Sequence, residues 1–215
     1  MSLDLTQGNE LSGQQEEKLL LQYAQLGRHF SDITEFFETL NFHQIRYAVL
    51  RNWEELPDSV ELGAHSDLDL LVDDQDIMKM NGICRLVNRN LQTWITQRLI
   101  WVGESYIKLD VRSLADQYLP AQLAQEILLH RQAEKCFFIP RSREYFFSLL
   151  YHAAFQKPKI GPDYQEIFQK IAVPDFDLAR LQDKKYVQRY FQQYGYGLVE
   201  PFDPFVWWER HEEGV

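Results

Sequence analysis

The segment at residues 67–72, Asp-Leu-Asp-Leu-Leu-Val, constrains the fold more than any other part of the sequence. Apolar and polar residues alternate and the segment then becomes fully apolar, which is typical of a β-strand that enters a hydrophobic core. Side chains two residues apart on a strand point to the same face, so we expect Asp67 and Asp69 side by side. Adjacent carboxylates repel each other, and aspartate is depleted in strands. The segment therefore predicts a half-buried strand whose start carries a cation site.

A third aspartate follows the same pattern on a later strand. Asp110 lies between two apolar residues in the strand-like segment 106–111, where a carboxyl group needs a partner. If the two strands are neighbours, Asp67, Asp69 and Asp110 form one cluster. Mg²⁺ and Mn²⁺ prefer carboxylate oxygens, and two such ions can activate an attacking oxygen and neutralise a leaving pyrophosphate. We therefore predict a catalytic metal site on these three residues.

The residues leave a structural alternative open for these acids. Asp67 can cap a turn with Ser66, and Asp110 can form a salt bridge with Arg112 or Arg51. An Asp-x-Asp triplet is a weak signal by itself, because the chain contains three of them. The other two triplets lie at expected helix starts, where negative charge suits the helix dipole: Asp74/Asp76 and Asp175/Asp177. We assign only the first triplet to the site.

The periodicity of apolar residues predicts an α/β or α+β fold, in which a small mixed sheet is flanked by helices. Strands are expected at 45–50, 68–72, 93–102, 106–111 and 137–139. Helices are expected at 14–26, 32–42, 74–90, 120–130, 141–155, 164–171 and 177–193. Ser31 is the expected N-cap of the second helix. We divide the chain into four parts: an N-terminal helical segment (1–29), an α/β core (30–115), a helical C-terminal region (116–193) and an aromatic-rich tail (194–215).

Composition and net charge indicate which partners and which compartment to expect, but they say little about the reaction. A formal net charge of −10 gives a surface that repels phosphates, which argues against long nucleic acid as a partner. The apolar runs are too short to cross a bilayer, so we expect no membrane span. Residues 1–13 lack the basic-then-apolar order of a secretory signal. We therefore expect a cytoplasmic protein.

The tail at 194–215 is crowded with aromatic residues. So many exposed rings would form an unusual apolar patch, and we expect the tail to fold back onto the body of the protein. The alternative is a segment that binds a protein partner.

The segment 65–72, His-Ser-Asp-Leu-Asp-Leu-Leu-Val, together with Asp110 in its apolar strand, resembles the signature of the nucleotidyltransferase superfamily. That signature places Gly-Ser on a turn after a first strand, Asp-x-Asp or Asp-x-Glu on a second strand, and a third acid on a later strand. Residues 47–52, Tyr-Ala-Val-Leu-Arg-Asn, are similar to those of uncharacterised bacterial nucleotidyltransferase-like proteins, some of which accompany surface-polysaccharide gene sets. The resemblance is specific over residues 45–112, about a third of the chain.

The resemblance implies a small mixed sheet flanked by helices, and a C-terminal helical part that helps to hold the nucleotide or the acceptor. It implies the transfer of a nucleotidyl group from a nucleoside triphosphate (NTP), with Mg²⁺ or Mn²⁺ as cofactor. By motif match, Asp67, Asp69 and Asp110 would ligate the metal. Asp110 would also accept the proton of the acceptor hydroxyl.

Two positions depart from the signature. Arg51 and Asn52 stand where small residues would let backbone N–H groups approach the phosphates, and His65 replaces the glycine before Ser66. Arg51 can bind a phosphate through its guanidinium fork, and Ser66 can donate a hydrogen bond to it. We include Arg51, Asn52 and Ser66 as nucleotide-binding residues.

Two residues on or after the expected helix 141–155 complete the set of predicted nucleotide-binding residues. Lys157 precedes a proline and can reach a phosphate, and His152 can contact a base or the acceptor. The alternatives are a core histidine and a solvated lysine at a helix end.

Two hypotheses about function follow. The first is an enzyme that moves a nucleoside monophosphate from an NTP to a small or protein acceptor. The second is a catalytically silent protein of the same fold that binds a nucleotide or a protein partner. The altered glycine pair favours the second, whereas three mutually repelling carboxylates favour the first. We take the enzyme as the leading hypothesis.

Overall fold

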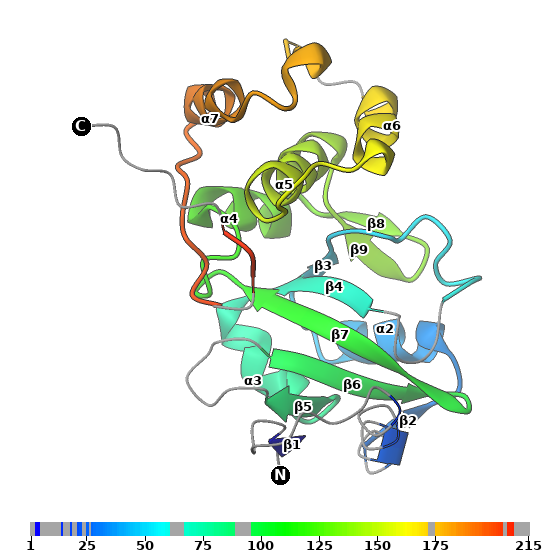
Figure 1. Cartoon of the computed structure of the whole chain (residues 1–215). Coiled ribbons are helices and arrows are strands. Elements are labelled where there is room, and N and C mark those ends of the chain that lie inside the picture. The colour runs from blue at the N-terminus through cyan, green and yellow to red at the C-terminus, as the bar shows by residue number, and fades with distance from the viewer. Residues whose placement is uncertain are drawn as a thin grey trace.

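The computed structural model describes residues 27–60, 67–88, 96–171, 175–203 and 206–208, and a few positions before residue 27. Helices and a mixed sheet make up this part of the chain (Figure 1), so the expected α/β class is confirmed. The helix expected at 14–26 lies largely outside the described residues, and His65 and Ser66 lie wholly outside them. Each helix in the described part is too short or too polar to span a bilayer.

A seven-stranded sheet lies at the centre of the described chain (Figure 1). Its strands follow one another in the order β1 (Leu3–Asp4), β5 (Arg85–Asn88), β6 (Thr96–Val102), β7 (Ser105–Ser113), β4 (Asp67–Val72) and β3 (Tyr47–Val49), and β2 (His29–Phe30) pairs with β6. β6 and β7 form the expected hairpin, with Gly103 at a positive φ of 58° in the turn. β4 and β7 run parallel although β4 is antiparallel to β3. The two aspartate-bearing strands are therefore neighbours, as expected.

Alternation along β4 separates two hydrophobic clusters on opposite faces of the sheet. Leu68 and Leu70 pack into the cluster that contains α2 (Ile33–Phe42). Leu71 packs into the other cluster, with α4 (Ala121–His130) and α5 (Ser142–Phe155). Because residues two apart share a face, Asp67 and Asp69 lie on the same face as Leu71. The acids therefore point toward the C-terminal helices.

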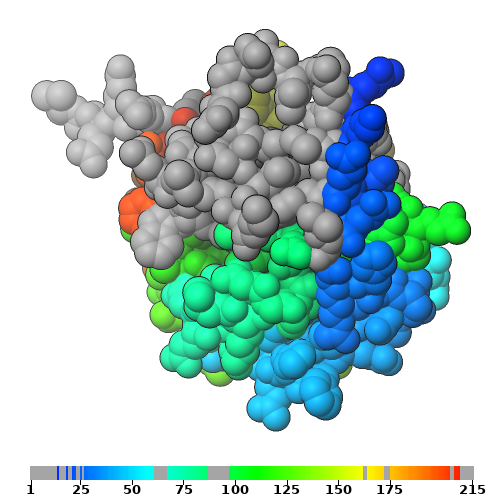
Figure 2. Space-filling model, turned by 90° about the horizontal axis from the view of Figure 1, so that it is seen from below, coloured from blue at the N-terminus to red at the C-terminus, as the bar shows by residue number. Residues whose placement is uncertain are grey.

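The face opposite α4 and α5 is covered by α2 and by the short helix α3 (Ile77–Met80), whose residues join one cluster. Figure 2 shows these two segments across the underside of the molecule. The cap of α2 differs from the prediction. Asp32, not Ser31, accepts the N–H of Glu35, while the Ser31 N–H donates to the Glu35 carboxylate. The aspartate side chain occupies the capping position because it lies three residues before Glu35.

The prediction of one long helix over 74–90 is wrong. The chain forms a 3-10 turn (Asp74–Asp76), then α3, and then β5 at Arg85–Asn88. Turns through Asn81 and Gly82 end α3, because their N–H groups donate to carbonyls three residues earlier. Residues 85–88 then pair with β6. Strand pairing has overridden a helical spacing of apolar residues.

The C-terminal region (116–193) is helical apart from a small hairpin of β8 (Gln132–Glu134) and β9 (Phe137–Ile139), which lies between α4 and α5 in the sequence. Its further helices are α6 (Pro162–Lys170), the 3-10 turn η2 (Leu178–Arg180) and α7 (Lys184–Gln193). The single helix expected at 177–193 is therefore divided in two. Asp183 starts α7 anew by accepting the N–H of Tyr186.

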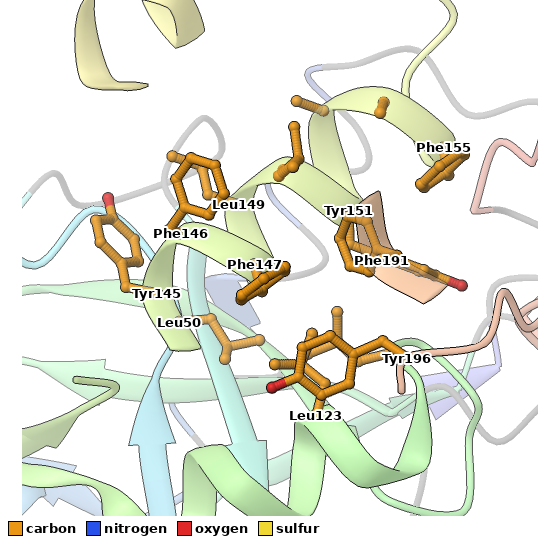
Figure 3. Packing of buried hydrophobic residues seen from close by; sticks show 14 of the residues in the cluster. Leu50, Leu123, Tyr145, Phe146, Phe147, Leu149, Tyr151, Phe155, Phe191 and Tyr196 are labelled. Carbon is orange, nitrogen blue, oxygen red and sulfur yellow. The ribbon is translucent and has the colours of Figure 1, made fainter. Parts of the chain in front are cut away.

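Helix α5 is buried on all sides and organises this region (Figure 3). Phe147 is 0% exposed and contacts the rings of Phe191 and Tyr196, from α7 and the tail. Trp208 in the tail lies against Tyr151 of α5. The described part of the tail therefore folds back onto the body, which confirms that expectation.

We predict that Phe147→Ala lowers the free energy of unfolding by about 3–5 kcal/mol, because it removes a large ring from a packed core. Phe42→Ala serves as the control, since Phe42 is 81% exposed, and it should change stability by less than about 0.5 kcal/mol. Urea unfolding of both variants measures the difference. Equal losses would contradict the central packing role of α5.

Candidate functional site

A cavity of about 840 Å³ lies between the acid-bearing face of the sheet and helices α5 and α6. The sheet, the loop after β3 and the loop after α5 contribute charged residues to its lining, which we call the charged floor: Arg51, Asp67, Asp69, Asp110, Arg112 and Lys157. Helices α5 and α6, the residue after α6 and the tail contribute apolar and aromatic residues, which we call the aromatic wall: Tyr145, Leu149, Tyr164, Ile167, Ile171 and Trp207. Glu54 and Lys170 also line the cavity. The cavity therefore offers a charged floor and a wall suited to a flat ring.

The three predicted acids meet at the charged floor. In the parallel ladder of β4 and β7, the Cα of Asp69 lies directly opposite that of Asp110, and Asp67 lies opposite Lys108. Adjacent strands are about 4.8 Å apart, so the two facing carboxyl groups are close neighbours. Asp69 is only 5% exposed, whereas Asp67 is exposed at the start of the strand. The three acids therefore lie together on one face, and Asp67 is the most exposed of them.

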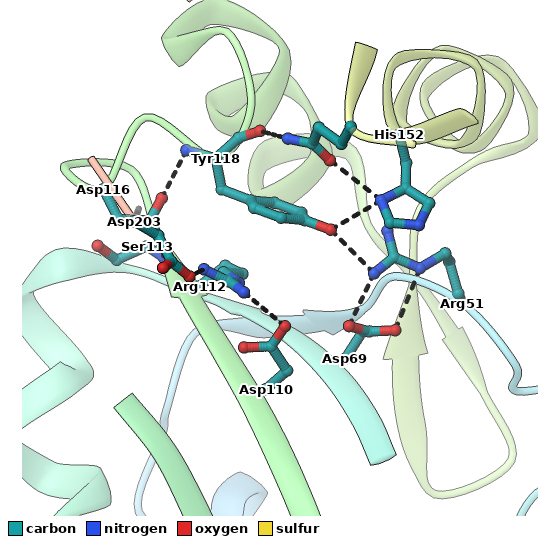
Figure 4. Close-up of polar contacts among 10 residues, drawn as sticks. Arg51, Asp69, Asp110, Arg112, Ser113, Asp116, Tyr118, His152 and Asp203 are labelled. Atoms are coloured by element: carbon teal, nitrogen blue, oxygen red, sulfur yellow. Dashed lines mark hydrogen bonds and ion pairs between the residues drawn. The ribbon is translucent and has the colours of Figure 1, made fainter. Parts of the chain in front are cut away.

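Arginines neutralise the two inner acids (Figure 4). Arg51 Nη2 lies 2.7 Å from Oδ1 of Asp69, and Arg51 Nε donates to Oδ2 at 3.1 Å. Arg112 donates to Asp110 Oδ2 at 2.7 Å and to Asp203 Oδ2 at 2.8 Å. The salt bridge between Asp110 and Arg112, which the sequence left as an alternative, is therefore present.

Burial and mutual repulsion disturb the ionisation of the acids. Burial raises the pKa of Asp67, and the charge of Asp69 raises it further. Burial also raises the pKa of Asp110, although Arg112 opposes that shift. Asp110 Oδ1 is buried without a hydrogen-bond partner among the described residues. A buried carboxylate oxygen without a partner is costly, so a cation or a donor near Oδ1 would be stabilised.

The three acids are of the ligand type that a divalent metal needs, but they are not arranged as a complete metal site in this structure. Carboxylate oxygens are the ligands that Mg²⁺ and Mn²⁺ prefer. Asp110 Oδ1 is such an oxygen, and it has no hydrogen-bond partner among the described residues. Within the described ranges, no group of three or more His, Cys, Asp or Glu side chains is placed to hold a metal ion. Arg51 occupies both oxygens of Asp69. Asp67, Asp69 and Asp110 would hold the metal only if Arg51 moved.

A buried polar network stands behind Arg51. Tyr118 Oη accepts from Arg51 Nη2 at 3.0 Å and lies 3.0 Å from His152 Nδ1. Gln156 Nε2 donates to the Tyr118 carbonyl, which turns Gln156 Oε1 toward His152 Nδ1 at 3.1 Å. Since Oε1 can only accept, this network assigns the proton to Nδ1. Burial, followed by the charge of Arg51, holds the pKa of His152 well below its usual value, so the ring is neutral.

The predicted nucleotide-binding residues converge on the same cavity. Arg51, Asn52, His152 and Lys157 all line it, and Ser66 lies outside the described residues. His152 is buried on α5 and also lines the cavity. It therefore combines the position of a core histidine with a place in the cavity lining. Asn52 has a positive φ of 59°, a conformation that favours glycine. The turn thus adopts a glycine-like backbone without a glycine.

Several residues of the site were not predicted as part of it. The sequence offers Arg112 only as an alternative salt-bridge partner of Asp110, although it lies two residues after Asp110 on the same strand and so shares its face. Tyr118 and Gln156 gave no signal, since they come from a loop and a helix end that only the fold brings together. The aromatic wall likewise depends on the packing of α6 and the tail.

Comparisons with known proteins do not extend this assignment. A scan against protein-family models, a search of curated proteins and a search of solved structures found no match. The nucleotidyltransferase resemblance of residues 45–112 therefore stays a prediction from the sequence. Function has to be argued from the site itself.

We predict that Asn52→Gly keeps the stability of the protein, because glycine adopts the observed φ of 59° without strain. Asn52→Val should cost about 1–2 kcal/mol, because a branched side chain is unfavourable in the left-handed region. Urea unfolding measures both variants. A valine variant as stable as the glycine variant would show that the loop conformation is different.

Asp116 anchors the loop that carries Tyr118. It is 2% exposed, and its carboxylate accepts the N–H groups of Ser113 and Tyr118. Burial raises its pKa to about 6. Because the folded state favours the protonated form, this group stabilises the protein fully at a pH below its unfolded pKa of about 4. The contribution is lost as the pH rises through the pKa of the folded state.

We therefore predict that the wild type loses stability relative to Asp116→Asn, by about 3 kcal/mol, between about pH 4 and pH 7. The amide imitates the protonated acid and does not titrate, so the difference between the two proteins isolates this group. Urea unfolding across that range measures it. A difference that does not change with pH would contradict the prediction.

Proposed function

We propose that the cavity binds a nucleoside triphosphate with Mg²⁺ or Mn²⁺, and that the protein transfers the nucleoside monophosphate group to an acceptor. The observation that carries the proposal is the register of β4 and β7, which brings Asp69 opposite Asp110 with Asp67 on the same face. Three carboxylates on one face of two neighbouring strands repel one another. A divalent ion bound there would neutralise them and the charge that develops on the phosphates.

The charged and the aromatic parts of the lining suit the two ends of a nucleotide. Arg51 and Lys157 lie at the charged floor, where they suit phosphate oxygens. Tyr145, Tyr164 and Trp207 lie along the aromatic side, where a base can stack on a ring. A volume of about 840 Å³ falls within the range of small-ligand sites.

The reaction is a displacement at the α-phosphorus. The acceptor oxygen forms a bond to that phosphorus, the bond to the β-phosphate oxygen breaks, and pyrophosphate leaves. The proton of the acceptor hydroxyl passes to a base, and Asp110 is the assigned base because Oδ1 accepts no hydrogen bond within the described residues. The acceptor is a small molecule or a protein, since a net charge of −10 disfavours long nucleic acid.

One observation favours the second hypothesis, a catalytically silent protein that binds a nucleotide or a protein partner. Arg51 already neutralises Asp69 through both carboxylate oxygens, so the inner acid has a partner without any metal. A chain that had lost the reaction would be stabilised by such a pair. Metal dependence of nucleotide binding separates the two hypotheses.

We predict that one or more NTPs raise the melting temperature only with Mg²⁺ or Mn²⁺. The increase should be roughly 5–10 °C at about a hundredfold excess over Kd. Asp69→Asn should remove this increase, whereas Asp58→Asn, outside the cavity lining, should keep it. Thermal unfolding with each of the four NTPs, with and without metal, measures the effect. An equal increase without metal supports the silent binder, and no increase with any NTP rejects nucleotide binding.

A further inference from the structure

Arg51 and Arg112 hold the two inner acids in different ways. Arg51 binds both oxygens of Asp69, at 2.7 and 3.1 Å. Arg112 binds one oxygen of Asp110, at 2.7 Å, and the other oxygen, Oδ1, has no hydrogen-bond partner in the described part of the chain. Asp110 therefore has an oxygen open to a further cation, whereas a cation on Asp69 would lie beside the guanidinium of Arg51 and be repelled by it.

The two arginines also differ in what else they contact. Arg112 bridges two carboxylates, those of Asp110 and Asp203, and its guanidinium lies 4.3 Å from the centre of the Tyr118 ring. Arg51 pairs with one carboxylate and donates a further hydrogen bond to the neutral hydroxyl of Tyr118 at 3.0 Å. Moving Arg112 would separate it from two buried charges, which is costly. Moving Arg51 separates it from one.

Arg51 is placed to move. It belongs to the loop after β3, beside Asn52, and not to a strand of the sheet. Its side chain lines the cavity although it is only 8% exposed. A ligand in the cavity can therefore contact Arg51.

We infer that Arg51 is an exchangeable counter-ion, which neutralises Asp69 until a phosphate group binds its guanidinium and Asp69 becomes free to ligate a divalent ion. This inference rests on the proposed function and deepens it. A guanidinium binds phosphate with the same planar fork that it offers to a carboxylate. The exchange keeps charges paired, because Arg51 passes from a carboxylate to a phosphate while a metal takes its place on Asp69.

The exchange couples the binding of the metal to the binding of the triphosphate, so that each ligand raises the affinity for the other. A divalent ion alone must compete for Asp69 with a buried arginine of the same chain, so its affinity is low. Removal of that competitor should raise the affinity for metal even without nucleotide. The coupling between two ligands of one site is reciprocal, so the metal also favours the phosphate-bound position of Arg51.

The test is Mn²⁺ binding in the absence of nucleotide, followed by the electron paramagnetic resonance of free Mn²⁺. Arg51→Gln removes the charge and should bind Mn²⁺ at least about tenfold more tightly than the wild type. Arg51→Lys keeps a charge but loses the planar guanidinium fork. Its affinity for Mn²⁺ should lie between those of the wild type and Arg51→Gln. Arg46→Gln is the matched control, because Arg46 pairs with Asp73 at 3.1 Å but does not line the cavity.

A double variant, Arg51→Gln with Asp69→Asn, identifies where the gained ion binds. Loss of the gain in this variant supports the inference. A gain that persists would overturn it, since the ion would then respond to net charge and not to a freed Asp69. Equal affinities of the wild type, Arg51→Gln and Arg51→Lys would also overturn it.

Failure of this inference is distinguishable from failure of the proposed function. Wild-type protein that binds an NTP with metal, while Arg51→Gln shows no gain in Mn²⁺ affinity, overturns the exchange alone. Failure of the proposed function would show as no NTP binding by the wild type in the presence of metal. That result would also overturn the phosphate-driven exchange.

Discussion

The pairing of buried carboxylates with arginines on one face of the sheet is the interaction on which the site depends. The parallel register of β4 and β7 places Asp69 opposite Asp110, and this arrangement is unfavourable unless cations balance it. Arg51 and Arg112 supply that balance. Through Tyr118 they connect to His152 on α5, so the charged floor and the helical wall of the cavity are held together by one network.

The strand on which this network rests was predictable, because its sequence pattern is local. Alternation in residues 67–72 placed Asp67 and Asp69 on one face, and the apolar residues around Asp110 identified its strand. The hairpin at Gly103 was likewise predictable, since it needs only a turn between two β-rich segments. These features depend on residues close in the sequence, and the structure confirms them.

Other features depend on contacts between distant segments and were not predictable. Residues 85–88 show a helical spacing, yet they form β5 because β6 offers an edge with which to pair. The partners of the acids were visible only as alternatives, since Arg51 lies 18 residues before Asp69. Tyr118 and Gln156 reach the site from a loop and from the end of α5. Long-range packing, which no local pattern encodes, decides these contacts.

A crystal structure with Mn²⁺ and a non-hydrolysable NTP analogue, using the anomalous signal of manganese, tests the proposed site most directly. We predict an anomalous peak among Asp67, Asp69 and Asp110, phosphates on the guanidinium of Arg51, and the base along the aromatic wall of the cavity. A nucleotide bound without manganese while Arg51 still pairs with Asp69, or a peak remote from these acids, would contradict a metal-dependent nucleotide site.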